Sequence, residues 1–371
     1  MAQDSKVLIA LGSSALFGAE RRFFKIIRYL QDKDDVSLDV LLVVNSSLYR
    51  PASQVPWIGQ ILESLSARKR LCVVPDKPSH LFDMRGLAGF LYFFLFAKTA
   101  HCVLRGRLVA YLRALLGLPV FFEVTSPDIA ARVGLGLPFF FLKRIRFICV
   151  SPSISRRFVQ DISKRLSAAQ VEQVDVTHAS IPFFEGEDRH LRPEEKQPWI
   201  VSASRFLERK NVVLFAECVK DAIADLEGWK IFILGQGPME GAIRKVLGAE
   251  ISAGHVVVGY DPKIAETIAR SSLYVSLIEP DNYPSQSILE AMAFGNALLL
   301  SDTGNSKKFL NDDLSNGMLV PLDRKKIGDA LKFMASSMPA LVSMGRKSQA
   351  TVRERFSHDV YMKEFIDRHV G

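Results

Sequence analysis

Short β-branched runs alternate with longer stretches of helical period through most of the 371 residues. Several runs are continuously apolar, which is typical of strands in a sheet that is covered on both faces. Repeated strand–helix units of this kind predict parallel sheets with right-handed crossovers, and therefore an α/β protein. The expected strands are Val7–Leu11, Leu38–Val44, Arg70–Val74, Val120–Val124, Phe147–Val150, Ile200–Ala203, Lys230–Leu234, Val256–Gly259, Leu273–Leu277 and Ala297–Ser301, and the clearest expected helices are Glu20–Leu30, Asn211–Ile223, Met239–Val246 and Ile264–Ala269.

The strand–helix pattern restarts near Trp199, after a polar stretch at 185–197 that contains Pro193. Such a stretch is typical of a linker between domains. We therefore predict two Rossmann-like domains that face each other across a cleft, with ligands at the carboxyl ends of the strands. The first domain is expected over 1–185 and the second over 199–350.

Cysteine usage and the apolar stretches limit the class of protein. The four cysteines contain no CxxC pair, which disfavours both a disulfide framework and a zinc site. The apolar run Val7–Leu11 is shorter than the ~7 residues that a signal peptide needs. The stretch Gly86–Ala97 is shorter than the ~20 residues that span a bilayer. We expect a cytoplasmic protein without a metal or other cofactor.

The positive charge lies in the first half of the sequence. Residues 1–190 hold 25 Lys+Arg and 17 Asp+Glu, whereas residues 191–371 hold 23 of each, so the net charge of +8 comes from the first half. The same half contains the aromatic segments 89–98 and 137–147. Two interpretations stay open: the aromatic rings are core, or they form a surface that contacts anionic lipid at the inner face of a membrane. No nucleic-acid-binding motif accompanies the charge.

The segment Ser204–Asn211 follows directly after an expected strand and carries two cations. Arg205 stands at the strand end, and Lys210 stands five residues later near the start of the next helix. Cations beside a helix N-terminus form a favourable binding site for a diphosphate. A strand followed by charged loop residues is also common without any ligand, so the segment alone decides nothing.

A second turn, Gly235–Pro238, also joins a strand to a helix. Its glycines permit a tight turn close to a ligand, and the proline suits the first position of a helix. The third glycine of a dinucleotide fingerprint is missing. A plain strand–helix turn is the alternative interpretation.

The third segment, Glu279–Gly304, is the most informative. A strand leads into a polar loop, a helix starts near Pro284–Gln286 and stops at Gly295, and the next strand ends at Asp302-Thr-Gly. Glu290 lies about one turn into this otherwise apolar helix. A carboxylate among such neighbours either pairs with a cation or binds sugar hydroxyls.

Together these segments resemble the nucleotide-sugar domain of family-four, GT-B-fold retaining glycosyltransferases. The likeness covers about 199–323, while the first half resembles the family more loosely. It implies a C-terminal helix, 354–371, that packs back onto the first domain. The matching residues are Arg205 and Lys210, Gly235–Pro238, Glu290–Gly295, Ser301–Gly304 and Asn316–Pro321.

The resemblance implies a role for each matched position. Arg205 and Lys210 neutralise the leaving diphosphate, and Glu290 binds the ribose hydroxyls. Tyr260 lies beside the base, Gly18 lets the first loop approach the phosphates, and the loop 283–287 offers backbone amides. Because the cations carry the charge, no metal is required. The implied donor-binding residues are Gly18, Gly235, Gly237, Tyr260, Asn282, Tyr283, Ser285, Gln286 and Ser287.

Two positions depart from the family pattern. Asn282 stands where the family has a glutamate, with Glu279 three residues earlier, and Thr125 falls near the place of a frequent histidine. The polar groups near Thr125 are Glu123, Ser126 and Asp128.

The resemblance therefore leads us to expect a metal-independent, retaining hexosyltransferase. It moves sugar from a nucleotide-diphosphate sugar to a glycan or lipid-linked acceptor in cell-surface polysaccharide or glycolipid synthesis. The alternative is a GT-B protein that binds nucleotide sugar or a partner without turnover. A phosphorylase or epimerase on this fold is disfavoured, because no lysine is placed for a pyridoxal cofactor.

Overall fold

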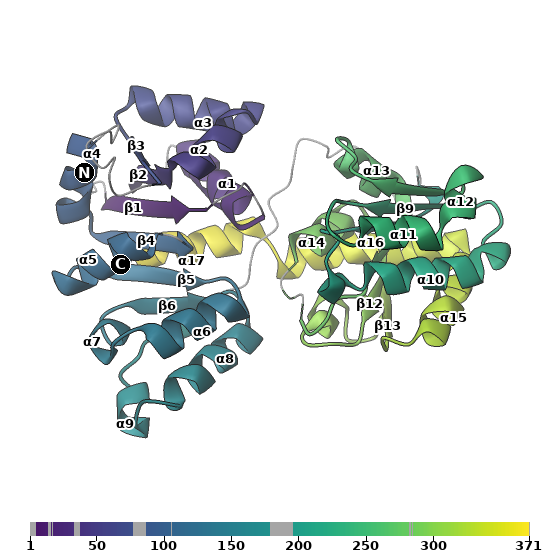
Figure 1. Cartoon of the computed structure of the whole chain (residues 1–371). Coiled ribbons are helices and arrows are strands. Elements are labelled where there is room, and N and C mark those ends of the chain that lie inside the picture. Colours follow the sequence, from purple (N-terminus) through teal and green to yellow (C-terminus); the bar gives the residue numbers. More distant parts are fainter. Residues whose placement is uncertain are drawn as a thin grey trace. The chain divides into compact units, whose positions relative to one another are not determined.

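The chain forms two units in the computed structural model (Figure 1). The structure describes residues 5–13, 16, 18–32, 38–76, 87–104, 106–178, 196–281, 283 and 285–370. The first unit comprises Met1–Ser180 with Asp359–Gly371, and the second comprises Ile181–His358. The last helix of the chain thus belongs mainly to the first unit, and it begins at His358.

The first unit is built on a seven-stranded parallel sheet in the order β3-β2-β1-β4-β5-β6-β7. Helices cover the sheet, as its buried apolar strands require. The strands are β1 Ser5–Gly12, β2 Leu38–Asn45, β3 Leu71–Val74, β4 Thr99–Leu104, β5 Val120–Val124, β6 Arg146–Cys149 and β7 Val176–His178. The helices are α1 Gly18–Asp32, α2 Ser46–Ser53, α3 Pro56–Ala67, α4 Leu87–Phe96, α5 Arg107–Leu115, α6 Pro127–Gly136, α7 Phe139–Leu142, α8 Pro152–Ser163, α9 Ala168–Val171 and α17 His358–Val370.

The second unit is built on a six-stranded parallel sheet in the order β10-β9-β8-β11-β12-β13. Neighbouring strand residues enter two separate cores on opposite faces: Ile231 enters one core and Phe232 the other. The strands are β8 Gln197–Ala203, β9 Lys230–Leu234, β10 Val256–Gly259, β11 Ser271–Ser276, β12 Ala297–Ser301 and β13 Gly317–Val320. The helices are η3 Glu208–Lys210, α10 Val212–Ala222, η4 Ile223–Asp225, α11 Glu240–Val246, α12 Gly248–Ser252, α13 Ile264–Arg270, α14 Gln286–Ala293, η5 Ser306–Phe309, α15 Arg324–Ala335 and α16 Met338–Arg355.

All ten predicted strands and the four named helices are confirmed, with shifts of a few residues at their ends. Among the described residues, three strands were not predicted from the sequence: β4, β7 and β13. The omission of β4 matters most, because it pairs with both β1 and β5 in the middle of the sheet. Its polar residues, Thr99 and His101, break the apolar run by which its neighbours were recognised.

Those polar residues find partners on the C-terminal helix α17. Thr99 Oγ1 lies 2.6 Å from His369 Nδ1, and His369 Nε2 lies 3.3 Å from His101 Nδ1. On the other side of His101, its Nε2 lies 3.5 Å from Glu123 Oε2. Glu123 also forms an ion pair with Arg22 of α1. A buried polar chain therefore connects α1, two central strands and α17.

All four cysteines are free and buried, as the sequence predicts. Burial raises the pKa of each thiol to about 12. Within the described part of the chain, none of the helices combines the length and the apolar character that a bilayer span needs.

The two buried histidines predict a pH-dependent stability. Burial lowers the pKa of His101, although Glu123 opposes this, and burial with the nearby His101 lowers the pKa of His369 well below its usual value. The unfolded chain therefore binds more protons below about pH 6.5, so stability that is present above that pH is lost as the pH falls. We expect each histidine to remove up to about 1.4 kcal/mol per pH unit from the free energy of unfolding.

Denaturant unfolding followed by circular dichroism checks this between about pH 7 and about pH 5.5. His369→Gln should flatten the pH dependence, while the control His255→Gln, at an exposed position, should leave it unchanged. Equal slopes in all three proteins would contradict the assignment.

Candidate functional site

Most of the predicted site residues lie at one edge of the six-stranded sheet. The loops that follow β8, β9, β10, β11 and β12 all leave from the carboxyl ends of parallel strands (Figure 1). Because β9, β8, β11 and β12 are neighbours in the sheet, their loops are neighbours too. The sequence motifs that were recognised one by one are thus parts of a single edge.

The loops after β8 and β9 touch through their backbones. Phe206 N–H donates to Gln236 O at 2.9 Å, and Met239 N–H donates to Phe206 O at 3.2 Å. Gly235 and Gly237 make this contact possible, since a Cβ on Gly235 would overlap Ser204 O and one on Gly237 would lie 2.5 Å from Phe206 O. Both glycines also have positive φ, of +148° and +154°. The glycines hold the Arg205 loop in place, a task the sequence alone left undecided.

The other end of the Arg205–Lys210 segment is hydrogen-bonded to the residues that follow β11. Asn211 adopts a left-handed conformation with φ of 51°, and its Nδ2 donates to Leu277 O at 2.8 Å. Glu279 N–H donates to Arg209 O at 3.0 Å. The segment that carries Arg205 and Lys210 is therefore fixed on both sides by hydrogen bonds, one of them from the Asn211 side chain.

The loop after β11 is held in turn by the loop after β12. Ser301 Oγ and Thr303 Oγ1 donate to Ile278 O at 2.8 and 2.6 Å. Asp281 accepts from Asn305 N–H at 3.1 Å and from Asn305 Nδ2 at 2.8 Å. The Ser301–Gly304 motif thus organises the neighbouring loop.

Tyr274 is a site-supporting residue that the sequence reading missed. This buried side chain of β11 donates its hydroxyl to Ala203 O, at the end of β8, at 3.0 Å. Burial raises its pKa, while a hydrogen bond with Ser287 acts in the opposite direction and the Glu290 carboxylate adds to the rise. Tyr274 therefore joins the end of β8 to the first turns of α14. Its position inside an apolar strand gave no signal of this.

The helix α14 brings several of the predicted residues together. Ser285 precedes the helix, and its Oγ lies 3.1 Å from Ser287 Oγ. Gln286 is the first helical residue, and Glu290 is half-buried one turn later. The Tyr283 ring packs 5.1 Å from the Phe309 ring, and the Tyr283 amide donates to Asp281 Oδ1 at 3.0 Å. The Tyr283 amide is thus engaged within its own loop.

The electrostatics of Lys210 mark this edge as a place for an anion. Burial, together with the charges of Arg209 and Arg205, lowers its pKa from 10.5 to about 7. The protonated form of Lys210 is thus disfavoured first by desolvation and then by the neighbouring positive charges. An anion placed there would raise the pKa again and bind more tightly to the protonated form.

Two predicted donor residues have a less defined place. Tyr260 follows β10 and is 70% exposed. Its neighbour Gly259, with φ of +131°, accepts from Gly235 N–H at 2.9 Å, so the Tyr260 loop adjoins the Gly235 turn. Asn282 lies outside the described residues.

The predicted polar groups of the first unit divide into an interior group and an edge group. Glu123 is 2% exposed, and its pKa, which burial alone would raise, is held below its usual range by Arg22 and His101. Thr125 and Ser126 follow the carboxyl end of β5, where Ser126 Oγ accepts from Ile129 N–H at 3.3 Å. Asp128 is exposed in the first turn of α6. Gly18 is the first residue of α1.

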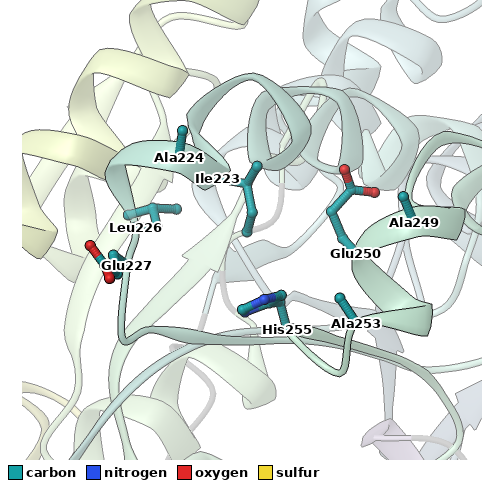
Figure 2. Close-up of a pocket in the computed structure, with 8 residues that line it drawn as sticks. All are labelled: Ile223, Ala224, Leu226, Glu227, Ala249, Glu250, Ala253 and His255. Carbon is teal, nitrogen blue, oxygen red and sulfur yellow. The ribbon is translucent and has the colours of Figure 1, made fainter.

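A pocket of about 380 Å³ lies at the opposite edge of the second sheet (Figure 2). Glu227 and His255, which precede β9 and β10, line it together with Glu250 of α12. Because it borders the amino ends of the strands, it is separate from the edge that holds Arg205 and Glu290. Among the described residues, no group of three or more His, Cys, Asp or Glu is arranged to hold a metal ion.

The contact between the loops after β8 and β9 gives a direct test. Gly235→Ala forces a methyl group against Ser204 O, so we expect it to destabilise the protein by roughly 2–4 kcal/mol. Gly241→Ala is the matched control, because nothing lies within 4 Å of the added Cβ. In the helix α11 this alanine should stabilise by about 0.5–1 kcal/mol. Denaturant titration measures both, and a neutral Gly235→Ala would contradict the close approach.

Comparison with known proteins agrees with this arrangement. Residues 197–337 match the family described as glycosyl transferases group 1. No curated protein matches the sequence. A glycosyltransferase from Rickettsia africae ESF-5 superposes with a TM-score of 0.69 at 12% identity, covering 100% of this chain and 98% of its own.

Two further solved structures are similar over nearly their whole length. Anabaena Alr3699/HepE, in complex with UDP-glucose, gives a TM-score of 0.68 at 15% identity and 98% coverage of both chains. The lipopolysaccharide outer core galactosyltransferase WaaB, in its apo form, gives 0.65 at 14% identity and 99% coverage of both. The chain therefore has the GT-B fold of two Rossmann-like domains, and residues 197–337 within it match the model of the glycosyl transferases group 1 family.

Proposed function

We propose that this protein is a retaining, metal-independent glycosyltransferase that moves a hexosyl group from a nucleotide-diphosphate sugar to a glycan or lipid-linked acceptor. The observation that carries the proposal is the placement of Arg205, Lys210 and Glu290 on adjoining segments at one sheet edge, with the pKa of Lys210 lowered to about 7. The similar structure of Alr3699/HepE contains UDP-glucose, which supports a donor of this class.

Arg205 and Lys210 supply the positive charge that the reaction needs. The bond between the anomeric carbon and the diphosphate oxygen breaks, and negative charge accumulates on the leaving group. Cations that are already held in place stabilise that charge without reorganisation. The backbone hydrogen bonds donated by Phe206 and Glu279, with the side-chain hydrogen bond donated by Asn211, provide this fixed position. Two cations at the diphosphate can serve in place of a metal ion.

The proposed reaction also assigns roles to the acceptor hydroxyl and to the ribose of the donor. The acceptor hydroxyl forms the new glycosidic bond on the face that the diphosphate leaves, and its proton passes to the departing phosphate oxygen. A strong protein base is then unnecessary, in keeping with Thr125 where the family often has a histidine. Glu290 accepts hydrogen bonds from the ribose hydroxyls of the donor, beside the first turn of α14.

The acceptor class is proposed from the chemistry of the relatives and from charge. WaaB is named for transfer in the lipopolysaccharide outer core, a membrane glycolipid. The positive charge of this chain is concentrated in its first half. A cytoplasmic enzyme that meets its glycan or lipid-linked acceptor at the inner face of a membrane fits both, in cell-surface polysaccharide or glycolipid synthesis.

A second candidate is a protein that binds nucleotide sugar without transferring it. Asn282 favours it, because it replaces the glutamate that the family pattern has at this position. A panel of nucleotide sugars separates the two candidates. Thermal stabilisation by one donor together with product formation supports the transferase, and stabilisation without hydrolysis or transfer on any acceptor supports the binding protein.

Removal of the two cations tests the role of the site. We expect Arg205→Ala and Lys210→Ala each to lower kcat/KM for the donor by about 10²–10³-fold, because each deletes a fixed charge at the leaving diphosphate. Lys245→Ala, an exposed lysine further along α11, is the charge-matched control and should retain activity. Parent-like kcat/KM in both site variants would refute the assignment.

The lowered pKa of Lys210 predicts proton uptake when a nucleoside diphosphate binds. The affinity should fall by up to about tenfold per pH unit above pH 7, because the anion selects the protonated lysine. Isothermal titration calorimetry with UDP, in buffers of different ionisation enthalpy, measures the uptake directly.

Lys210→Arg is the matched variant, since arginine stays charged throughout this range. It should bind UDP with a smaller proton uptake and a flatter pH profile. The nucleotide's own phosphate titrates in both proteins, so their difference isolates Lys210. Identical uptake in the two proteins would show that Lys210 does not meet the diphosphate.

A further inference from the structure

The helix α5 of the first unit exposes leucines and buries an arginine. Its inner side holds Arg113 together with the small apolar residues Val109, Ala110 and Ala114. Arg113 is 0% exposed and donates to the carbonyl oxygens of Phe94 and Ala97 at 2.7 and 2.9 Å. The leucines on the outer side are Leu108, Leu112, Leu115 and Leu116, of which Leu108 is 62% exposed. A soluble surface normally places these residue types the other way round.

The neighbouring helix α4 continues this apolar surface. Phe93 and Phe94 are buried and Phe90 is half-buried. The exposed large side chains of the helix are Leu87, Leu91, Tyr92, Leu95 and Phe96, and Phe96 is 66% exposed. The Arg113 hydrogen bonds join the end of α4 directly to α5. On its other side α5 meets α7, where the Tyr111 and Phe141 rings lie 5.6 Å apart.

We name the exposed side chains of α4 and α5, with Phe140 of α7, the apolar face. The C-terminal ends of these three helices lead into β4, β5 and β6, which are adjacent strands. The apolar face is therefore contiguous at the amino edge of the sheet, and Leu108 extends it toward the carboxyl edge. Contiguous exposed apolar surface of this kind marks an interaction site.

Basic side chains surround the apolar face. Lys98 follows α4, and Lys143 and Arg144 follow α7, all of them exposed. The Arg144 guanidinium stacks over the Phe140 ring at 3.8 Å, and Lys6 Nζ lies 5.7 Å from the centre of the Tyr92 ring. Cations that rest on exposed aromatic rings keep their charge at the rim of the apolar surface. The chain's net charge of +8 arises in this half of the sequence.

We infer that the apolar face is a docking surface for a bilayer that contains anionic lipid. Leucine and phenylalanine side chains enter the boundary between headgroups and acyl chains, and the lysine and arginine rim binds lipid phosphates. Charge complementarity selects this occupant over a second copy of the chain, because two such faces would bring one basic rim against another. The inference concerns a surface of the first unit and does not depend on the transfer reaction.

The test is co-sedimentation of the full-length protein with vesicles, in the absence of donor and acceptor. We expect binding to vesicles of phosphatidylcholine with phosphatidylglycerol, weaker binding to phosphatidylcholine alone, and loss of binding as salt is raised. Leu112→Ser with Leu116→Ser should weaken binding by about tenfold for each leucine. Lys143→Glu with Arg144→Glu should weaken it by about fivefold or more for each charge.

Phe333→Ser is the matched control, since Phe333 is 64% exposed on α15 of the second unit and lies outside the apolar face. It should bind vesicles like the parent. Because all the replaced side chains are exposed, circular dichroism should show the parent fold in every variant. Equal vesicle binding by parent and leucine variants would overturn the inference. A concentration-dependent dimer that the leucine variants abolish, without vesicle binding by the parent, would overturn it in favour of a second copy.

Discussion

The backbone contact between the loops after β8 and β9 is the constraint on which the site depends. Phe206 and Gln236 exchange a hydrogen bond at a place where Gly235 and Gly237 leave no room for a Cβ. From there the chain of contacts continues through Asn211 and Leu277 to the loop after β11. A parallel sheet brings strand ends together but leaves their loops independent. These contacts turn separate loops into one rigid edge, which is what a fixed pair of cations requires.

The sequence predicted the fold well because its strands carry their own signal. Covered parallel strands are uninterrupted apolar runs, and turns with glycine and proline separate them. The strand β4 lacked that signal, since His101 and Thr99 interrupt its apolar run. Thr99 Oγ1 and His101 Nδ1 lie within hydrogen-bond distance of His369, which is 268 residues further along the chain from His101. A partner so distant in sequence cannot be read from a local pattern, although it decides whether a polar residue is tolerated inside a sheet.

The sequence signals of the candidate site differ in what they reveal about position. Glycines, cations and carboxylates at strand ends are visible in a sequence, and those of the second unit lie together at one edge of its sheet. Glu123 has the same appearance beside a strand end, yet Arg22 and His101 enclose it in the interior. Tyr274 shows the reverse case, because an aromatic residue in an apolar strand looks like core and yet its hydroxyl joins β8 to α14. Residue type alone does not give the direction in which a side chain points.

The conspicuous motifs of the second unit therefore contain two kinds of residue with different physical tasks. Gly235, Ser301 and Thr303 hold loops together. Gly235 allows the close backbone approach, and the two hydroxyl groups donate hydrogen bonds to the neighbouring loop. The protonated form of Lys210 is instead destabilised, because burial and the neighbouring arginines lower its pKa to about 7. Destabilised charges of this kind are typical of sites where a ligand of opposite charge binds. The residues that hold the loops together keep Lys210 in this environment, because a looser loop would let the ammonium group move into water.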